Sequence, residues 1–153
     1  MEVKIKRLTN NFQDIIQEII EIEQEAFGAG GLNEWSITPF IYHGAVYIAR
    51  IDQEVVGVIE YMRDFDKVNK TYLYGLAVDK DYRNQGIGNK LLKYSLNKLK
   101  GDKIKEVELT VDPDNEEALN LYREFGFERI AYRKAEYGPG EDRKIMKLDL
   151  ENL

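Results

Sequence analysis

The stretch from Val78 to Leu92 has the residues needed to bind a phosphate group. It reads V-D-K-D-Y-R-N-Q-G-I-G-N-K-L-L, an apolar strand that passes through a turn into the start of a helix. Residues 83–88 offer consecutive backbone N–H groups, and Gly86 and Gly88 have no Cβ to keep a ligand's oxygens away from them. The partial positive charge at a helix N-terminus adds attraction for a pyrophosphate. Basic side chains around the turn come from Lys80, Arg83, Lys90 and Lys93.

Two common nucleotide-binding motifs fit this turn poorly. A P-loop requires lysine and then serine or threonine directly after its last glycine, whereas Asn89 and Lys90 follow Gly88. A dinucleotide-binding turn requires a third glycine where Leu91 stands. The spacing that fits is R/Q-x-x-G-x-G/A, which residues 83–88 satisfy.

A second motif lies on a helix expected later in the chain. It has the form N-x-x-A-x-x-x-Y-x-x-x-G-F, and its members are Asn115, Ala118, Tyr122, Gly126 and Phe127. Taken alone, the motif describes an amphipathic helix with a glycine at its C-terminus, in which the tyrosine packs like the neighbouring apolar residues. The alternative is chemical, because a phenol with an ordinary pKa of about 10 keeps its proton at neutral pH and can donate it to a leaving group.

Apolar periodicity and turn residues predict the elements that position these groups. Strands are expected over residues 3–8, 45–51, 55–62, 71–78, 104–111, 127–135 and 144–150. Helices are expected from a cap at Asn10 or Asn11 to Phe27, within residues 32–42, over 86–99, and from Asp112 to 125. Three neighbouring antiparallel strands should run from residue 45 to 78. The strands 71–78 and 104–111 are joined by a helix and should therefore be parallel neighbours.

Composition limits the class of protein. The chain has 153 residues, which predicts one domain over residues 1–153, and its net charge of -6 argues against nucleic acid or an anionic membrane as partner. It has no cysteine, so acyl transfer cannot use a cysteine nucleophile. No set of histidine and acidic residues has metal-ligand spacing, which predicts no metal. The N-terminus lacks the apolar run of a signal peptide or membrane helix, so a cytoplasmic protein is expected.

The phosphate turn, the helix motif and the order of elements together resemble the GNAT acetyltransferase superfamily over nearly the whole chain. The resemblance implies an α/β fold with a mixed, mostly antiparallel twisted sheet and the order β-α-β-β-β-α-β-α-β-β. It also implies a splay between the fourth and fifth strands. Acetyl-CoA would be the cosubstrate, and its acetyl group would pass directly to an amine.

The same resemblance implies roles for individual residues. The cofactor would be bound by Leu76, Ala77, Val78, Arg83, Asn84, Gln85, Gly86, Ile87, Gly88, Asn89, Asn115, Ala118 and Tyr122. The Leu76 N–H is expected to stabilise the charge on the thioester oxygen, and Tyr122 to protonate the departing thiolate. Gly75 would permit a bulge that frees the strand edge; the alternative is that it relieves crowding between Tyr72 and Tyr74.

Within the family, the chain resembles the ribosomal-protein alanine N-acetyltransferase (RimI-like) group. The segments that carry this likeness include L-A-V-D-K-D-Y-R-N-Q-G-I-G, N-L-Y-R-E-F-G-F and E-D-R. The group's general base is a glutamate five residues before the asparagine of the helix motif, where this chain has Thr110. Glu108, two residues earlier on the same strand face, is the catalytic candidate that could act through water. The other candidates are Glu106, Glu60, Tyr72 and the single histidine, His43, which is more simply a structural residue.

The sequence therefore predicts an acetyl-CoA-dependent N-acetyltransferase. Its acceptor would be a protein N-terminal amine or a small amine such as a polyamine. The rivals are a CoA-binding sensor without turnover, motivated by Thr110, and a structural protein that binds no nucleotide. Tyr132 and Tyr137 could wall the acceptor pocket or be ordinary hairpin residues, and edge strands near the C-terminus could form a homodimer.

Overall fold

The computed structural model describes residues 2–153, and the strands of these residues form one mixed sheet. The seven strands follow the order β1-β2-β3-β4-β5-β7-β6. The pairs β1–β2, β2–β3, β5–β7 and β6–β7 are antiparallel, whereas β4 and β5 are parallel. The predicted α/β fold and the parallel pair are confirmed.

The elements lie close to the predicted ranges. The strands are β1 (Lys4–Arg7), β2 (Ala45–Ile51), β3 (Glu54–Arg63), β4 (Lys70–Val78), β5 (Glu106–Val111), β6 (Glu128–Arg133) and β7 (Arg143–Asp149). The helices are α1 (Ile16–Phe27), α2 (Glu34–His43), α3 (Ile87–Gly101) and α4 (Glu116–Glu124). Short 3-10 turns are η1 (Gly28–Gly30), η2 (Lys80–Tyr82) and η3 (Leu150–Asn152).

The predicted start of the first helix is wrong. Asn11 has a left-handed backbone with φ of 51°, and Ile15 rather than an asparagine is the residue before the helix. Phe12 and Ile15 belong to a preceding turn, in which the Ile15 N–H donates to the Phe12 carbonyl at 3.1 Å. Both side chains are buried, so the helix-like apolar spacing continues through a turn that precedes the helix.

The second helix begins at a capping box. The Asn33 side chain accepts hydrogen bonds from the backbone of Trp35 at 3.0 Å and of Ser36 at 3.2 Å, and the Ser36 hydroxyl accepts from the Asn33 N–H. These bonds satisfy donors that a helix otherwise leaves unpaired at its start.

The chain divides into two compact units. The first unit runs to Met62 and also contains Gly75–Asn97, and the second contains Arg63–Tyr74 and Lys98–Leu153. Strand β4 therefore supplies its N-terminal half to the second unit and its C-terminal half to the first. None of the helices in residues 2–153 is both long and apolar enough to cross a membrane.

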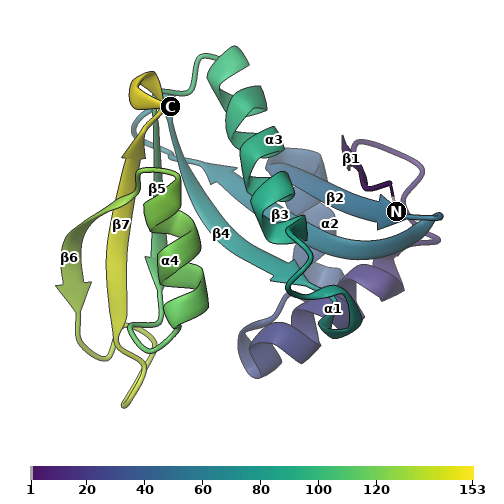
Figure 1. Ribbon diagram of the computed structural model, residues 1–153, viewed down its shortest axis with the longest axis horizontal. Helices are drawn as coiled ribbons and strands as arrows, with labels where there is room; N and C mark the ends of the chain where they lie inside the picture. Colours follow the sequence, from purple (N-terminus) through teal and green to yellow (C-terminus); the bar gives the residue numbers. More distant parts are fainter. Residues whose placement is uncertain (1) are drawn as a thin grey trace. The chain divides into compact units, whose positions relative to one another are not determined.

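In the first unit, helices cover both faces of β2 and β3. On one face, α1 and α2 pack their isoleucines against Val46, Ile48 and Val58 in a single buried cluster. On the other face, the Tyr47 ring meets the Tyr94 ring of α3 edge-on, with centroids 6.0 Å apart. Figure 1 shows α3 in front of these strands and α2 behind them.

Gly57 brings α3 close to the sheet. A Cβ at this position would lie 2.8 Å from Leu91 Cδ1 and 3.2 Å from Ile87 Cγ2, both on α3. We expect Gly57→Ala to lower the free energy of unfolding by about 1.5 kcal/mol, because the added methyl overpacks a filled core. Denaturant unfolding measures this change. Gly30→Ala is the control, since a Cβ there would have no neighbour within 4 Å, and an equal loss in both variants would contradict the packing argument.

In the second unit, β5 separates a buried face from a polar one. Val107, Leu109 and Val111 are buried, and α4 covers this unit's apolar side, where the rings of Tyr122 and Phe127 pack edge-on with centroids 5.5 Å apart. The alternate residues Glu106, Glu108 and Thr110 are half-buried. The parallel register with β4 runs from Lys70 opposite Glu106 to Leu73 opposite Leu109, and the predicted splay beyond it stays a prediction.

Candidate active site

The phosphate turn of the first unit connects the end of β4 to α3. Directly after the strand, the Asp79 N–H donates to the Val56 carbonyl at 2.8 Å. The Asp79 side chain accepts from the Asp81 N–H at 2.9 Å and so caps η2. The chain then turns through Asn84 and Gly86, whose φ angles of 62° and 78° are left-handed. Glycine adopts this region without penalty, and asparagine tolerates it better than other residues do.

The start of α3 leaves backbone donors for a ligand. The Lys90 N–H makes the first helical hydrogen bond, to the Gly86 carbonyl at 3.0 Å. The N–H groups of Ile87, Gly88 and Asn89 precede that bond, so the helix itself does not use them. The Ile87 side chain is 2% exposed and anchors the turn in the core. These donors, with the positive end of the helix, suit a pyrophosphate.

The Arg83 side chain braces the turn. Its Nε donates to the Val78 carbonyl at 3.1 Å, and its guanidinium forms an ion pair with Glu25 of α1. The cofactor role predicted for Arg83 therefore depends on its backbone and on the shape it gives the turn.

The strand residues predicted to bind the cofactor lie beyond the end of the β4–β5 register. Ala77 belongs to the buried cluster of the first unit, whereas Leu76 and Val78 are half-buried. Gly75 precedes them, and a Cβ on it would lie 3.0 Å from Glu60 Oε1 and 3.6 Å from Phe27 Cε2. The space that Gly75 leaves is thus taken by a carboxyl and a ring, and not by the tyrosines of β4.

The second unit holds the helix motif on α4. Asn115 caps this helix, because its Oδ1 accepts from the Ala118 N–H at 3.1 Å. Tyr122 is 7% exposed and packs on Phe127. The Asn115, Ala118 and Tyr122 spacing therefore forms a capped helix, as the sequence predicted.

Thr110 belongs to a chain of hydroxyl groups that sequence reasoning missed. Its Oγ1 lies 2.9 Å from the Tyr72 hydroxyl and 3.5 Å from the Tyr137 hydroxyl. Burial raises the pKa of Tyr72, and the neighbouring Tyr137 raises it further, so Tyr72 keeps its proton and is a poor base. The only sequence signal was that Tyr72 and Thr110 lie on two strands predicted to be parallel neighbours.

Glu108 is held by a lysine. Its Oε1 lies 3.2 Å from Lys70 Nζ, and Lys70 also lies 3.9 Å from Asp64. The Thr110 hydroxyl lies beside the hydroxyls of Tyr72 and Tyr137 and not beside Glu108. The Glu108 carboxylate thus contacts Lys70 and not the Thr110 hydroxyl, so this geometry gives no support to Glu108 as the base, and its role stays a prediction.

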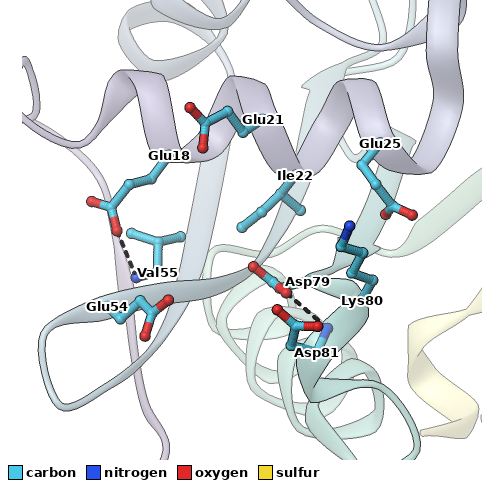
Figure 2. A pocket seen from close by; sticks show the side chains of 9 residues that line it. All are labelled: Glu18, Glu21, Ile22, Glu25, Glu54, Val55, Asp79, Lys80 and Asp81. Atoms are coloured by element: carbon cyan, nitrogen blue, oxygen red, sulfur yellow. Dashed lines mark hydrogen bonds between the residues drawn. The ribbon is translucent and has the colours of Figure 1, made fainter.

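A separate hollow in the first unit is strongly acidic. Its volume is about 270 Å³, and it is lined by Glu18, Glu21, Ile22, Glu25, Glu54, Val55, Asp79, Lys80 and Asp81. Figure 2 shows the carboxylates of α1 across from those of Glu54 and the two aspartates, with Lys80 among them. Such a lining repels phosphates, so the hollow does not suit CoA. No group of three acidic or histidine residues in the described chain could hold a metal ion.

Comparison with known proteins gives the family. Residues 14–127 match the model of the Acetyltransferase (GNAT) family. The chain belongs to this family. It is therefore an acyltransferase that uses acetyl-CoA as cosubstrate, and the fold and cofactor predicted from the sequence are confirmed.

This GNAT acetyltransferase is also similar to individual proteins. It is 33% identical to an N-alpha-acetyltransferase of Sulfurisphaera tokodaii over 119 residues, which cover 71% of each chain. Its fold matches Ard1 from Thermoplasma volcanium with a TM-score of 0.84 and 20% identity, covering 97% of this chain and 98% of that one. It also matches the ribosomal-protein-S18-alanine N-acetyltransferase from Escherichia coli with a TM-score of 0.76 and 22% identity, over 99% of each chain.

Proposed function

We propose that this acetyltransferase acetylates protein N-terminal amines. The observation that carries the proposal is the match to relatives named N-alpha-acetyltransferase, one of which is aligned over 150 residues, 91% of this chain, at 28% identity. A small amine or polyamine is the alternative acceptor, favoured by the net charge of -6. An acidic surface attracts cationic acceptors of either kind.

The phosphate turn supports the proposed binding of acetyl-CoA. The N–H groups of residues 83–89 would hold the pyrophosphate, and the basic side chains around the turn would add charge. The backbone of Leu76, Ala77 and Val78 would pair with the amides of the pantetheine arm, as an extended ligand pairs with a free strand edge. The Leu76 N–H would then stabilise the negative charge that develops on the thioester oxygen.

The helix motif of the second unit would bind the coenzyme and protonate the leaving thiolate. With Oδ1 of Asn115 committed to the cap, its side-chain amide can donate to the cofactor. The small Ala118 would let the cofactor approach the helix. Tyr122 would give its phenolic proton to the CoA thiolate as the C–S bond breaks. The single domain, cytoplasmic location and homodimer predicted from the sequence stay predictions.

The proposed function is tested with acetyl-CoA and an acceptor panel. We expect mass spectrometry to show a single acetyl group on the N-terminal amine of unblocked peptides, and none on matched peptides whose N-terminus is already acetylated. Acetylation of spermidine alone would contradict the peptide acceptor.

Binding of the cosubstrate is measured separately. CoA at a hundred times its dissociation constant is expected to raise the free energy of unfolding by about 2.7 kcal/mol. Binding without transfer to any amine would favour the sensor rival, and the absence of binding would favour a structural protein.

A further inference from the structure

Two buried glutamates of the first unit face each other inside an apolar region. Glu23 of α1 is 1% exposed and Glu60 of β3 is 0% exposed. Within residues 2–153, none of their four carboxyl oxygens makes a hydrogen bond of ordinary geometry, and neither carboxyl forms an ion pair. Buried carboxyl groups that face mainly each other lower stability, so the pair calls for an explanation.

The pair lies next to the strand position proposed to polarise the thioester. Glu60 Oε1 is the atom nearest to the space above Gly75, and Leu76 follows Gly75 directly. The edge of the Phe27 ring borders the same space, 3.6 Å from where a Cβ on Gly75 would lie. Phe27 is 43% exposed, so this ring reaches solvent at one side and the space above Gly75 at another.

The two carboxyl groups control each other's charge. Burial raises the pKa of Glu23, and the approach of Glu60 and of the Leu32 backbone offsets part of this rise. Burial also raises the pKa of Glu60 well above its ordinary value, and the charge of Glu23 raises it further. The uncharged residues Phe27 and Gly75 border Glu60, and Val46 pairs with it on the neighbouring strand β2. Like charges this close do not ionise together easily, so the pair binds a proton more tightly than ordinary carboxylates do.

We propose that Glu60 is the general base of the acetyl transfer, with Glu23 as the residue that positions and tunes it. This inference rests on the proposed function. The substrate ammonium gives one proton, through a water molecule admitted beside Phe27, to the Glu60 carboxylate. The neutral nitrogen then bonds to the thioester carbon, the C–S bond breaks, and the thiolate receives the Tyr122 proton. The new amide nitrogen loses its extra proton to the tyrosinate through solvent, and Glu60 later releases its own.

A base at Glu60 would replace the glutamate that this chain lacks at position 110. Threonine cannot accept a proton usefully at neutral pH, and Glu108 is ion-paired with Lys70. Among residues 2–153, no cation forms an ion pair with Glu60. A base whose pKa lies above its ordinary value holds the proton it removes more firmly.

The test is the pH dependence of kcat/KM for Glu60→Gln, which keeps the size of a protonated glutamate. We expect a loss of about a hundredfold at pH 6.5. The loss should shrink below about tenfold at pH 9.5, where a peptide amine with a pKa of about 8 is already neutral. Glu21→Gln is the control. It removes a charge from the solvent-exposed side of α1, the helix that carries Glu23, and should follow the wild-type profile. Wild-type kcat/KM at pH 6.5, or an equal loss at every pH, would overturn the proposal.

A second variant keeps the proposal testable if Glu60→Gln does not fold. Glu23→Gln removes the charge that raises the pKa of Glu60, so the acidic limb of the kcat/KM profile should move to lower pH. An acidic limb at the wild-type pH would overturn the proposed role of Glu23 in tuning Glu60. In both variants CoA affinity by calorimetry should stay within about twofold. If the wild-type enzyme itself acetylates no amine, the proposed function fails; if it does so and the variants match it, only the base assignment fails.

Discussion

Tyr122→Phe is expected to lower kcat for acetyl transfer about a hundredfold, the usual contribution of a positioned general acid. The variant loses only the hydroxyl, because the ring stays in its edge-on contact with Phe127, 5.5 Å between centroids. CoA affinity should therefore change by no more than about twofold. Mass spectrometry of reactions quenched at successive times measures kcat, and calorimetry measures the affinity for CoA.

A matched control is available on α2. Tyr42 also packs edge-on against a phenylalanine, Phe12, with centroids 5.4 Å apart, and its ring is 58% exposed. Tyr42→Phe should keep wild-type kcat. If Tyr122→Phe retains wild-type turnover across the pH range, Tyr122 is a packing residue and the leaving thiolate obtains its proton elsewhere.

Gly86→Val is expected to weaken CoA binding about thirtyfold, which corresponds to about 2 kcal/mol. A Cβ on Gly86 would meet no atom within 4 Å, so the effect comes from the backbone and not from a clash. The φ of 78° is strained for a branched side chain, and relief of this strain would turn the N–H groups of the turn away from the pyrophosphate. Calorimetric titration with CoA gives the change directly.

The other end of α3 provides the comparison. A Cβ on Gly101 would also meet open space, but this residue is not among those with a left-handed backbone. Gly101→Val should bind CoA like the wild type. Equal affinity in Gly86→Val would mean that the turn does not hold the cosubstrate.

Short-range patterns made the phosphate half of the candidate site predictable. Gly86, Gly88 and the apolar strand before them fix a strand, a turn and a helix within 15 residues, and β4 and α3 follow within two residues of the predicted bounds. The hairpin between β2 and β3 was equally clear, because Asp52 and Gln53 are turn residues and both adopt positive φ.

Contacts between distant segments were not predictable from such patterns. Strand β7 lies between β5 and β6, an order that depends on pairing across the whole sheet. The sequence gives only a weak indication of the Glu23–Glu60 pair. Glu23 falls on the helical stripe of Ile15, Ile19 and Ile22. Glu60 lies two residues after the buried Val58, on the same side of its strand. Each glutamate therefore occupies an interior position of its own element. Nothing local shows that these two interior positions meet.

With CoA bound at the phosphate turn as proposed, the close approach at Gly57 would link the interior of the first unit to the affinity for the coenzyme. The residues that would meet a side chain there, Ile87 and Leu91, lie in the first two turns of α3, directly after the phosphate turn. A bulkier residue in the sheet would push the donors of that turn outward without touching any ligand. During evolutionary divergence, a larger side chain at position 57 should then be accompanied by a smaller one at 87 or 91. Conservation of CoA affinity would therefore depend partly on core residues that do not contact CoA.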